Sequence, residues 1–227
     1  MNKHRRNLIY TGIQVAWRLI LGNIFFIASN IVLAILCFNL KFTLLTSIVY
    51  IAASITVFPS LVALVSYLRN DEVEDKFKLG AKVYFKAFKD AFKLGWSSNL
   101  IYELVLLFLV LDVASANKLM KDGQLLIPLL TLLIILTIIH AMWNILIQNY
   151  FYVGLKSSVI YSARLMVKKP VISLMMILLI FGDYLSFKLF PQYAILFIVP
   201  LTAYVLWKMT LKDFGLLKKE VVIKKIN

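Results

Sequence analysis

The sequence predicts an all-α membrane protein with six transmembrane helices, arranged as three hairpins in a single integral membrane domain of residues 1–227. Of the 227 residues, 62% are hydrophobic and 16% are charged, whereas typical soluble domains have about 45–50% and about 25%. Apolar segments long enough for a helix to cross a hydrocarbon core of about 30 Å recur along the chain. Lysine and arginine gather between these segments, as they do in membrane proteins.

Six apolar segments form the predicted spans. Pro59 lies inside the second and Pro200 inside the sixth. Each proline removes a backbone hydrogen bond, so we expect a helix kink at both positions. The predicted spans cover residues 19–40, 44–68, 94–113, 125–153, 171–187 and 193–211.

Polar and basic segments connect or flank these spans. Residues 1–18 are expected to form a lead-in at the membrane interface, with Trp17 and Arg18 as anchors at its boundary. Residues 154–169 form a polar, basic segment, and residues 212–227 form a basic, weakly amphipathic tail. These segments are predicted to lie at the membrane surface.

The segment 69–93 predicts an amphipathic helix along the interface. Its aromatic and alanine residues fall on one arc of about 120° at the helical period. Lysines line the neighbouring arc, where ammonium groups reach lipid phosphates while the rings lie among acyl tails. A solvated helix on a soluble core has the same pattern, but the long apolar segments on both sides favour the membrane. The lysines are Lys78, Lys82, Lys86, Lys89 and Lys93.

The distribution of cations predicts the orientation. Six spans place both termini on one side of the membrane, and 21 of the 25 lysine and arginine residues lie on that side, with 4 on the other. The cation-rich side faces the cytoplasm, so we expect a multi-pass protein of the cell membrane with cytoplasmic termini. The net charge of +14 could indicate nucleic acid, but the cations cluster at the ends of the apolar spans. The expected partners are therefore the bilayer and its anionic headgroups, and not nucleic acid.

Four polar residues inside the third and fourth spans are the candidate functional cluster. Glu103 and His140 lie near the middle of consecutive spans, and Asn99 and Asn144 each lie one helical turn away. Residues at equal depth in a hairpin can face each other, so we expect Glu103 to contact His140. The cluster is either a hydrogen-bonded clamp between helices or a proton relay or solute site.

Motifs for catalysis are absent from the sequence. It contains no G-x-x-x-x-G-K phosphate loop, no H-E-x-x-H metal motif and no G-x-S-x-G nucleophile motif. Its single cysteine, Cys37, lies in an apolar segment and allows no disulfide within the chain. We therefore expect no enzyme, no metal and no cofactor.

Several short motifs resemble the YesL-like family of bacterial integral membrane proteins. Trp17-Arg18 followed by Asn23 looks like the opening W-R…N of that family, and residues 58–64, FPSLVAL, are similar to its F-P-A-T-A-A-L motif. Residues 84–89, YFKAFK, resemble its F-[FW]-x-x-F-[KR] segment, and Asp112 resembles an acid that closes the third span. The chain departs from the family where Phe151 is followed by tyrosine instead of proline, which puts a kink or loop contact there in doubt.

The resemblance implies an accessory role in sugar uptake, because members of the family are often encoded beside carbohydrate ABC transporters. The chain would then dock on a transporter permease or a sensor kinase through its amphipathic segments or spans. The alternative is a small six-helix transporter or substrate-capturing component, with its polar site at Glu103 and His140. A transporter needs a polar cavity near the membrane midplane, and only the cluster around these two residues indicates one.

Overall fold

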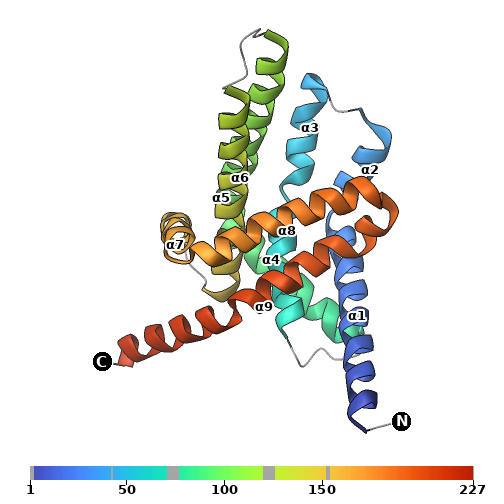
Figure 1. Cartoon of the computed structure of the whole chain (residues 1–227), viewed down its shortest axis with the longest axis vertical. Coiled ribbons are helices and arrows are strands. Elements are labelled where there is room, and N and C mark those ends of the chain that lie inside the picture. The colour runs from blue at the N-terminus through green and yellow to red at the C-terminus, as the bar shows by residue number, and fades with distance from the viewer. Residues whose placement is uncertain (1–2, 42, 71–76, 120–125, 152–153, 227) are drawn as a thin grey trace.

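The computed structural model describes residues 3–41, 43–70, 77–119, 126–151 and 154–226, and all regular structure within these ranges is helical. Figure 1 shows the helices as an irregular assembly around α4. For parts of α1, α3, α5, α7 and α9 only the backbone is described, as at residues 3–11 and 215–226. The helices are α1 Lys3–Ser29, α2 Ile31–Asn39, α3 Leu44–Ser54, α4 Val57–Arg69, α5 Phe77–Leu119, α6 Leu126–Tyr150, α7 Leu155–Lys168, α8 Pro170–Leu189 and α9 Pro191–Ile226.

The first two predicted spans are each interrupted. α1 gives way to α2 at Asn30, and α3 gives way to α4 at Ile55 and Thr56. The second interruption lies where Pro59 predicts it, because the ring of a proline clashes with the carbonyl four residues earlier, here that of Ile55. Pro59 itself lies in the first turn of α4, where its missing N–H costs nothing.

Three helices join segments that were predicted as separate elements. In α1 the predicted lead-in continues without a break into the first predicted span. The amphipathic segment and the third span were expected as separate elements, but residues 77–93 of that segment and the third span belong to the continuous 43-residue helix α5. The sixth span and the basic tail likewise form the 36-residue α9, which remains helical through Pro200. A change from an amphipathic to an apolar pattern does not end a helix. α5 also contains no proline that would interrupt its hydrogen bonds.

The remaining elements follow the predicted boundaries. The fourth span is α6, the basic segment 154–169 is the amphipathic helix α7, and the fifth span is α8. Prolines open α8 and α9, which agrees with the preference of proline for the first helical position.

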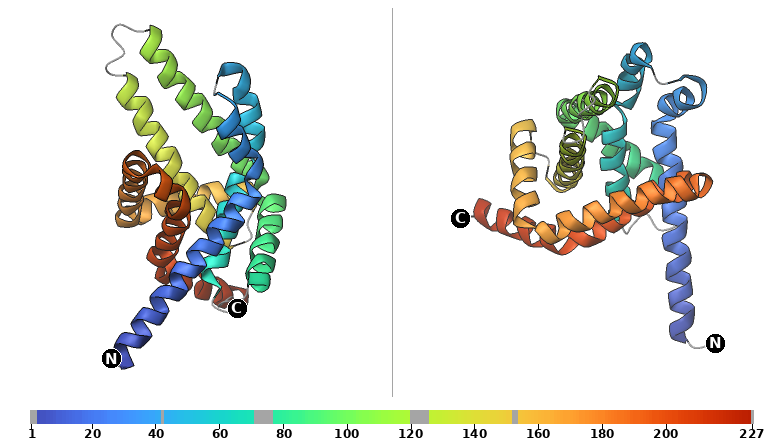
Figure 2. Two further views of the ribbon diagram at one scale, coloured as in Figure 1. Left: turned by 90° about the vertical axis from the view of Figure 1, so that its right-hand side faces the viewer. Right: turned by 45° about the horizontal axis from the view of Figure 1, so that its top comes forward.

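The structure supports a membrane protein, with four helical segments long and apolar enough to cross a bilayer among the residues described. These segments are Gly12–Ser29, Ile48–Arg69, Leu126–Tyr150 and Pro170–Leu189. α5 and α6 run side by side, whereas α8 and α9 run side by side across them at a steep incline (Figures 1 and 2). The arrangement of six spans as three hairpins with cytoplasmic termini therefore stays a prediction.

α4 lies at the centre of the assembly and packs against α1, α5, α6 and α9. Its fully buried side chains include Leu64 and Tyr67. Gly22 of α1 lies directly opposite, where an added Cβ would come within 2.9 Å of the Leu64 side chain. The small glycine therefore allows α1 to approach α4 closely.

Candidate functional site

The two interruptions lie side by side and are joined by hydrogen bonds. The Thr56 hydroxyl, at the α3–α4 interruption, donates to the Oδ1 atom of Asn30 over 2.8 Å. The Asn30 Nδ2 atom donates to the carbonyl of Phe26 over 2.8 Å. Asn30 thus bonds to a backbone carbonyl of α1 and to a side chain at the α3–α4 interruption. These bonds replace some of the helical hydrogen bonds that the interruptions remove.

Tyr84 of α5 extends this network from the amphipathic part of the helix. Its hydroxyl lies 2.8 Å from the Ser29 hydroxyl, which lies 2.9 Å from the hydroxyl of Ser60. Ser60 in turn donates to the carbonyl of Thr56 over 2.6 Å. Burial raises the pKa of Tyr84 to about 12, so its hydroxyl keeps its proton at physiological pH. We call Ser29, Asn30, Thr56, Ser60 and Tyr84 the interruption cluster.

Glu103 of α5 lies beside the interruption between α3 and α4. The hydroxyl of Ser54, the last residue of α3, donates to Oε2 of Glu103 over 3.2 Å. The other carboxyl oxygen, Oε1, is buried and has no hydrogen-bond partner. A carboxylate with so little compensation in an apolar layer is stabilised by binding a proton or a cation.

The predicted contact between Glu103 and His140 is wrong. Nδ1 of His140 lies 2.8 Å from the Tyr102 hydroxyl and Nε2 lies 3.1 Å from the carbonyl of Val159. Asn144 donates to the same Tyr102 hydroxyl over 3.1 Å, so the structure brings His140 and Asn144 together as predicted. The side chain of Asn99 lies outside the described residues.

Glu103 and His140 have separate partners for a geometric reason. Equal depth in a hairpin places Glu103 and His140 at one level, but it does not determine the rotation of either helix. Neighbouring residues on a helix point about 100° apart, and here Tyr102 faces α6 while Glu103 faces α3. Tyr102 also stacks on Phe58 of α4 at 5.8 Å between ring centroids. A buried tyrosine usually finds a partner for its hydroxyl, and this was the signal in the sequence that could have identified Tyr102.

The motifs behind the family resemblance have structural roles here. Arg18 donates to the carbonyls of Leu68 and Asn70 over 2.9 and 2.7 Å. It therefore caps the end of α4, where carbonyls lack helical partners. Six of the nine buried residues of α4 lie within residues 58–64. Trp17 is exposed, as are the five predicted interfacial lysines Lys78, Lys82, Lys86, Lys89 and Lys93.

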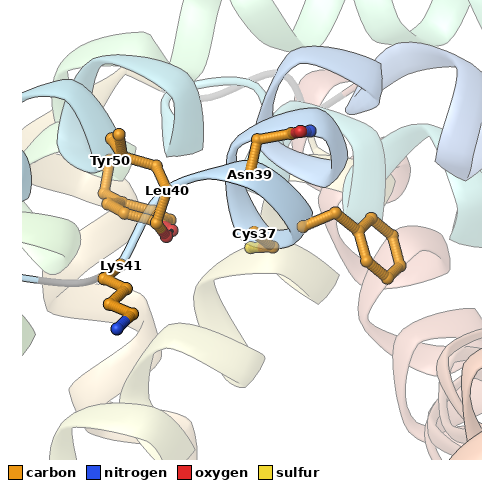
Figure 3. Close-up of a pocket in the computed structure, with 6 residues that line it drawn as sticks. Cys37, Asn39, Leu40, Lys41 and Tyr50 are labelled. Atoms are coloured by element: carbon orange, nitrogen blue, oxygen red, sulfur yellow. Dashed lines mark hydrogen bonds between the residues drawn. The ribbon is translucent and has the colours of Figure 1, made fainter.

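Two open cavities lie at opposite ends of the α3–α4 pair. The first, of about 610 Å³, is lined by residues of the α2–α3 connection, including Cys37, Lys41 and Tyr50. Figure 3 shows Tyr50 reaching toward Leu40, whose carbonyl it binds over 2.6 Å, while Lys41 points away. The second cavity, of about 350 Å³, lies between the end of α4 and the first half of α5.

Metal binding finds no support in the described part of the chain, where no group of three or more His, Cys, Asp or Glu residues could hold a metal ion. Comparison with protein-family models, with curated proteins and with solved structures finds no match. The YesL-like resemblance therefore stays a prediction from the quoted motifs.

Proposed function

We propose that this chain is a small membrane transporter or substrate-capturing component whose polar site is Glu103 at the interruption between α3 and α4. The observation that carries the proposal is the bond from Ser54 to Glu103, because it brings an acid to the end of a broken helix. Interrupted helices supply free backbone groups at membrane depth, and transporters bind coupling ions and solutes at such positions.

The neighbouring polar groups support this proposal. The unpartnered oxygen of Glu103 is shielded from solvent, so it gains most from a proton or a cation. The interruption cluster supplies side-chain hydrogen bonds at the two interruptions, where the continuous helical hydrogen bonding is broken. A proton or a small cation would thus bind between Glu103 and the end of α3.

Proton movement in proteoliposomes tests the proposal. The purified chain would be reconstituted with an internal pH-sensitive dye, and a potassium diffusion potential would drive protons inward. Glu103→Gln should keep the fold, because an amide can still accept from Ser54, but it should abolish the proton flux. Asp183→Asn is the matched control, because both oxygens of Asp183 already accept from Thr202. Equal flux in wild type and Glu103→Gln would contradict the proposal.

A second candidate function is supported by α8. Of its 20 residues only Ser173 and Met176 are buried, and Leu178 and Phe181 are each 58% exposed. Such a face suits contact with lipid or with a membrane partner. An accessory role, docked on a transporter permease or a sensor kinase, would use it, and the link to carbohydrate uptake comes from the family resemblance alone.

Site-specific crosslinking separates the two candidates. A photoreactive residue in place of Leu178 should capture one permease or kinase in native membranes if the chain is an accessory subunit. The same group in place of the exposed Leu132 of α6 serves as the control. Capture of lipid alone at both positions would contradict the accessory role.

A further inference from the structure

The cavity between α4 and α5 combines charges of both signs in one small space. Its volume of about 350 Å³ falls within the range of small ligand sites. Its polar lining consists of Ser66, Arg69 and Asn70 at the end of α4, together with Lys86 and Asp90 of α5. Apolar side chains of α5 complete the wall.

The charged groups of this cavity are not neutralised by one another. Lys86 and Asp90 are four residues apart on α5, a spacing that permits an ion pair, yet neither makes an ion pair with any described residue. The guanidinium of Arg69 is held over the ring of Tyr150, 4.6 Å from its centroid. Among the described residues, two cations and one acid therefore line the cavity, with a net charge of +1.

The surroundings of the cavity are those of a membrane boundary. Arg18 donates hydrogen bonds to the carbonyls of Leu68 and Asn70. These bonds hold the end of α4 in place on one side of the cavity. On α5, the exposed rings of Phe85 and Phe92 lie on the other side of the helix from the side chains that line the cavity, at about 100° per residue. A helix with charges on one side and exposed rings on another lies at a membrane surface with its charges at headgroup level.

We propose that this cavity binds the headgroup of an aminophospholipid. Lys86 and Arg69 hold the phosphodiester, since both donate charge-assisted hydrogen bonds to phosphate oxygens. Asp90 accepts from the primary ammonium group, which accounts for an acid in a cavity that two cations also line. The site is independent of Glu103, so it can be tested whatever the outcome at that residue.

Binding of defined lipids to the delipidated protein tests this proposal. Native mass spectrometry would compare palmitoyl-oleoyl phosphatidylethanolamine with the choline and glycerol lipids of the same chains. The wild type should prefer ethanolamine, because choline has no N–H to donate and glycerol has no cation for Asp90. Asp90→Asn should reduce this preference to less than about twofold, since one charge-assisted bond is lost.

The matched lysine variants test the phosphate contact. Lys86→Gln should weaken all three lipids about three- to tenfold, the effect of one ionic hydrogen bond at a partly exposed site. Lys188→Gln makes the same charge change on an exposed residue outside the cavity lining and should change binding less than twofold. Equal effects of the two variants, or an unchanged lipid preference in Asp90→Asn, would overturn the proposal.

Soluble phosphoethanolamine distinguishes a lipid from a free phosphorylated amine. If the ligand is a lipid, this headgroup alone should not displace phosphatidylethanolamine at millimolar concentration, because it lacks the acyl chains that add apolar binding energy. Displacement at micromolar concentration would overturn the lipid assignment and leave a site for a soluble amine phosphate.

Discussion

α4 and α8 are both apolar helices, yet their surroundings are opposite. Nine of the 13 residues of α4 are buried, whereas two of the 20 residues of α8 are. α4 is enclosed by four other helices, and α8 packs mainly against α9. The apolar side chains of α4 therefore serve packing within the protein, and those of α8 face outward.

This difference shows what apolar composition means in a membrane protein. Lipid tails are as apolar as leucine, so a helix gains little from exchanging lipid for protein unless the packing is close. Small and polar groups, such as Gly22 and Ser60, decide which helix is enclosed. We therefore expect substitutions in and around α4 to cost stability and matched substitutions in α8 to cost little.

The largest effect is expected for Leu64→Ala. Leu64 is fully buried in α4, and its truncation leaves a cavity that costs about 2–5 kcal/mol in protein cores. Leu178→Ala on α8 is the control, because its side chain is 58% exposed and lipid refills the space. The free energy of unfolding would be measured by SDS titration in mixed micelles. Equal losses at both positions would contradict the comparison.

Gly22→Ala is expected to destabilise the protein by about 1–3 kcal/mol, the range for overpacking. The new methyl group would lie 2.9 Å from Leu64 and 3.3 Å from the Tyr67 ring, and both side chains are fully buried. Gly182→Ala on α8 meets nothing within 4 Å, so it should be neutral or stabilising by up to about 1 kcal/mol through helix propensity. A thermal melt followed by circular dichroism would check both, and a stabilising Gly22→Ala would show that α1 does not approach α4 closely.

A smaller loss is expected for Tyr84→Phe, about 1 kcal/mol, because the change removes the hydrogen bonds of the Tyr84 hydroxyl to Ser29 and Ser60. The two serines keep their own contact, which limits the loss. Tyr184→Phe on α8 removes an exposed hydroxyl and should change stability by less than about 0.5 kcal/mol. The same SDS titration would compare the pair, and a larger loss for Tyr184→Phe would contradict the role of the interruption cluster.

The smallest effect is expected at the start of α8. Lys169 pairs with Asp213 of α9 over 2.6 Å, but the two side chains are 41% and 24% exposed, and exposed pairs contribute about 0–1 kcal/mol. Lys169→Gln should therefore lower stability slightly, and the loss should vanish at high salt. Lys188→Gln, at the other end of α8, provides the control without an ion pair among the described residues. A loss at Lys169 that salt leaves unchanged would mean that packing, not charge, holds this end.

Much of the local structure could be predicted from single residues. The interruption before Pro59 follows from the geometry of the proline ring, and Pro170 and Pro191 mark the starts of α8 and α9. The merging of the amphipathic segment into α5 could not be predicted from a change in polarity, because polarity reports the surroundings of a helix and not its end. For the same reason, composition did not distinguish the enclosed α4 from the outward-facing α8.

The polar residues of the candidate site show most clearly which properties depend on sequence and which depend on tertiary structure. The sequence alone determined a helical membrane protein with exposed lysines and with polar residues inside apolar segments, because these properties depend on residue type and spacing. Only the tertiary structure decided that Glu103 meets Ser54, that His140 meets Tyr102, and that Asn30 joins two interrupted helices. These pairings depend on the rotation of each helix about its axis, which is set by close packing among several helices and not by the spacing within any one of them.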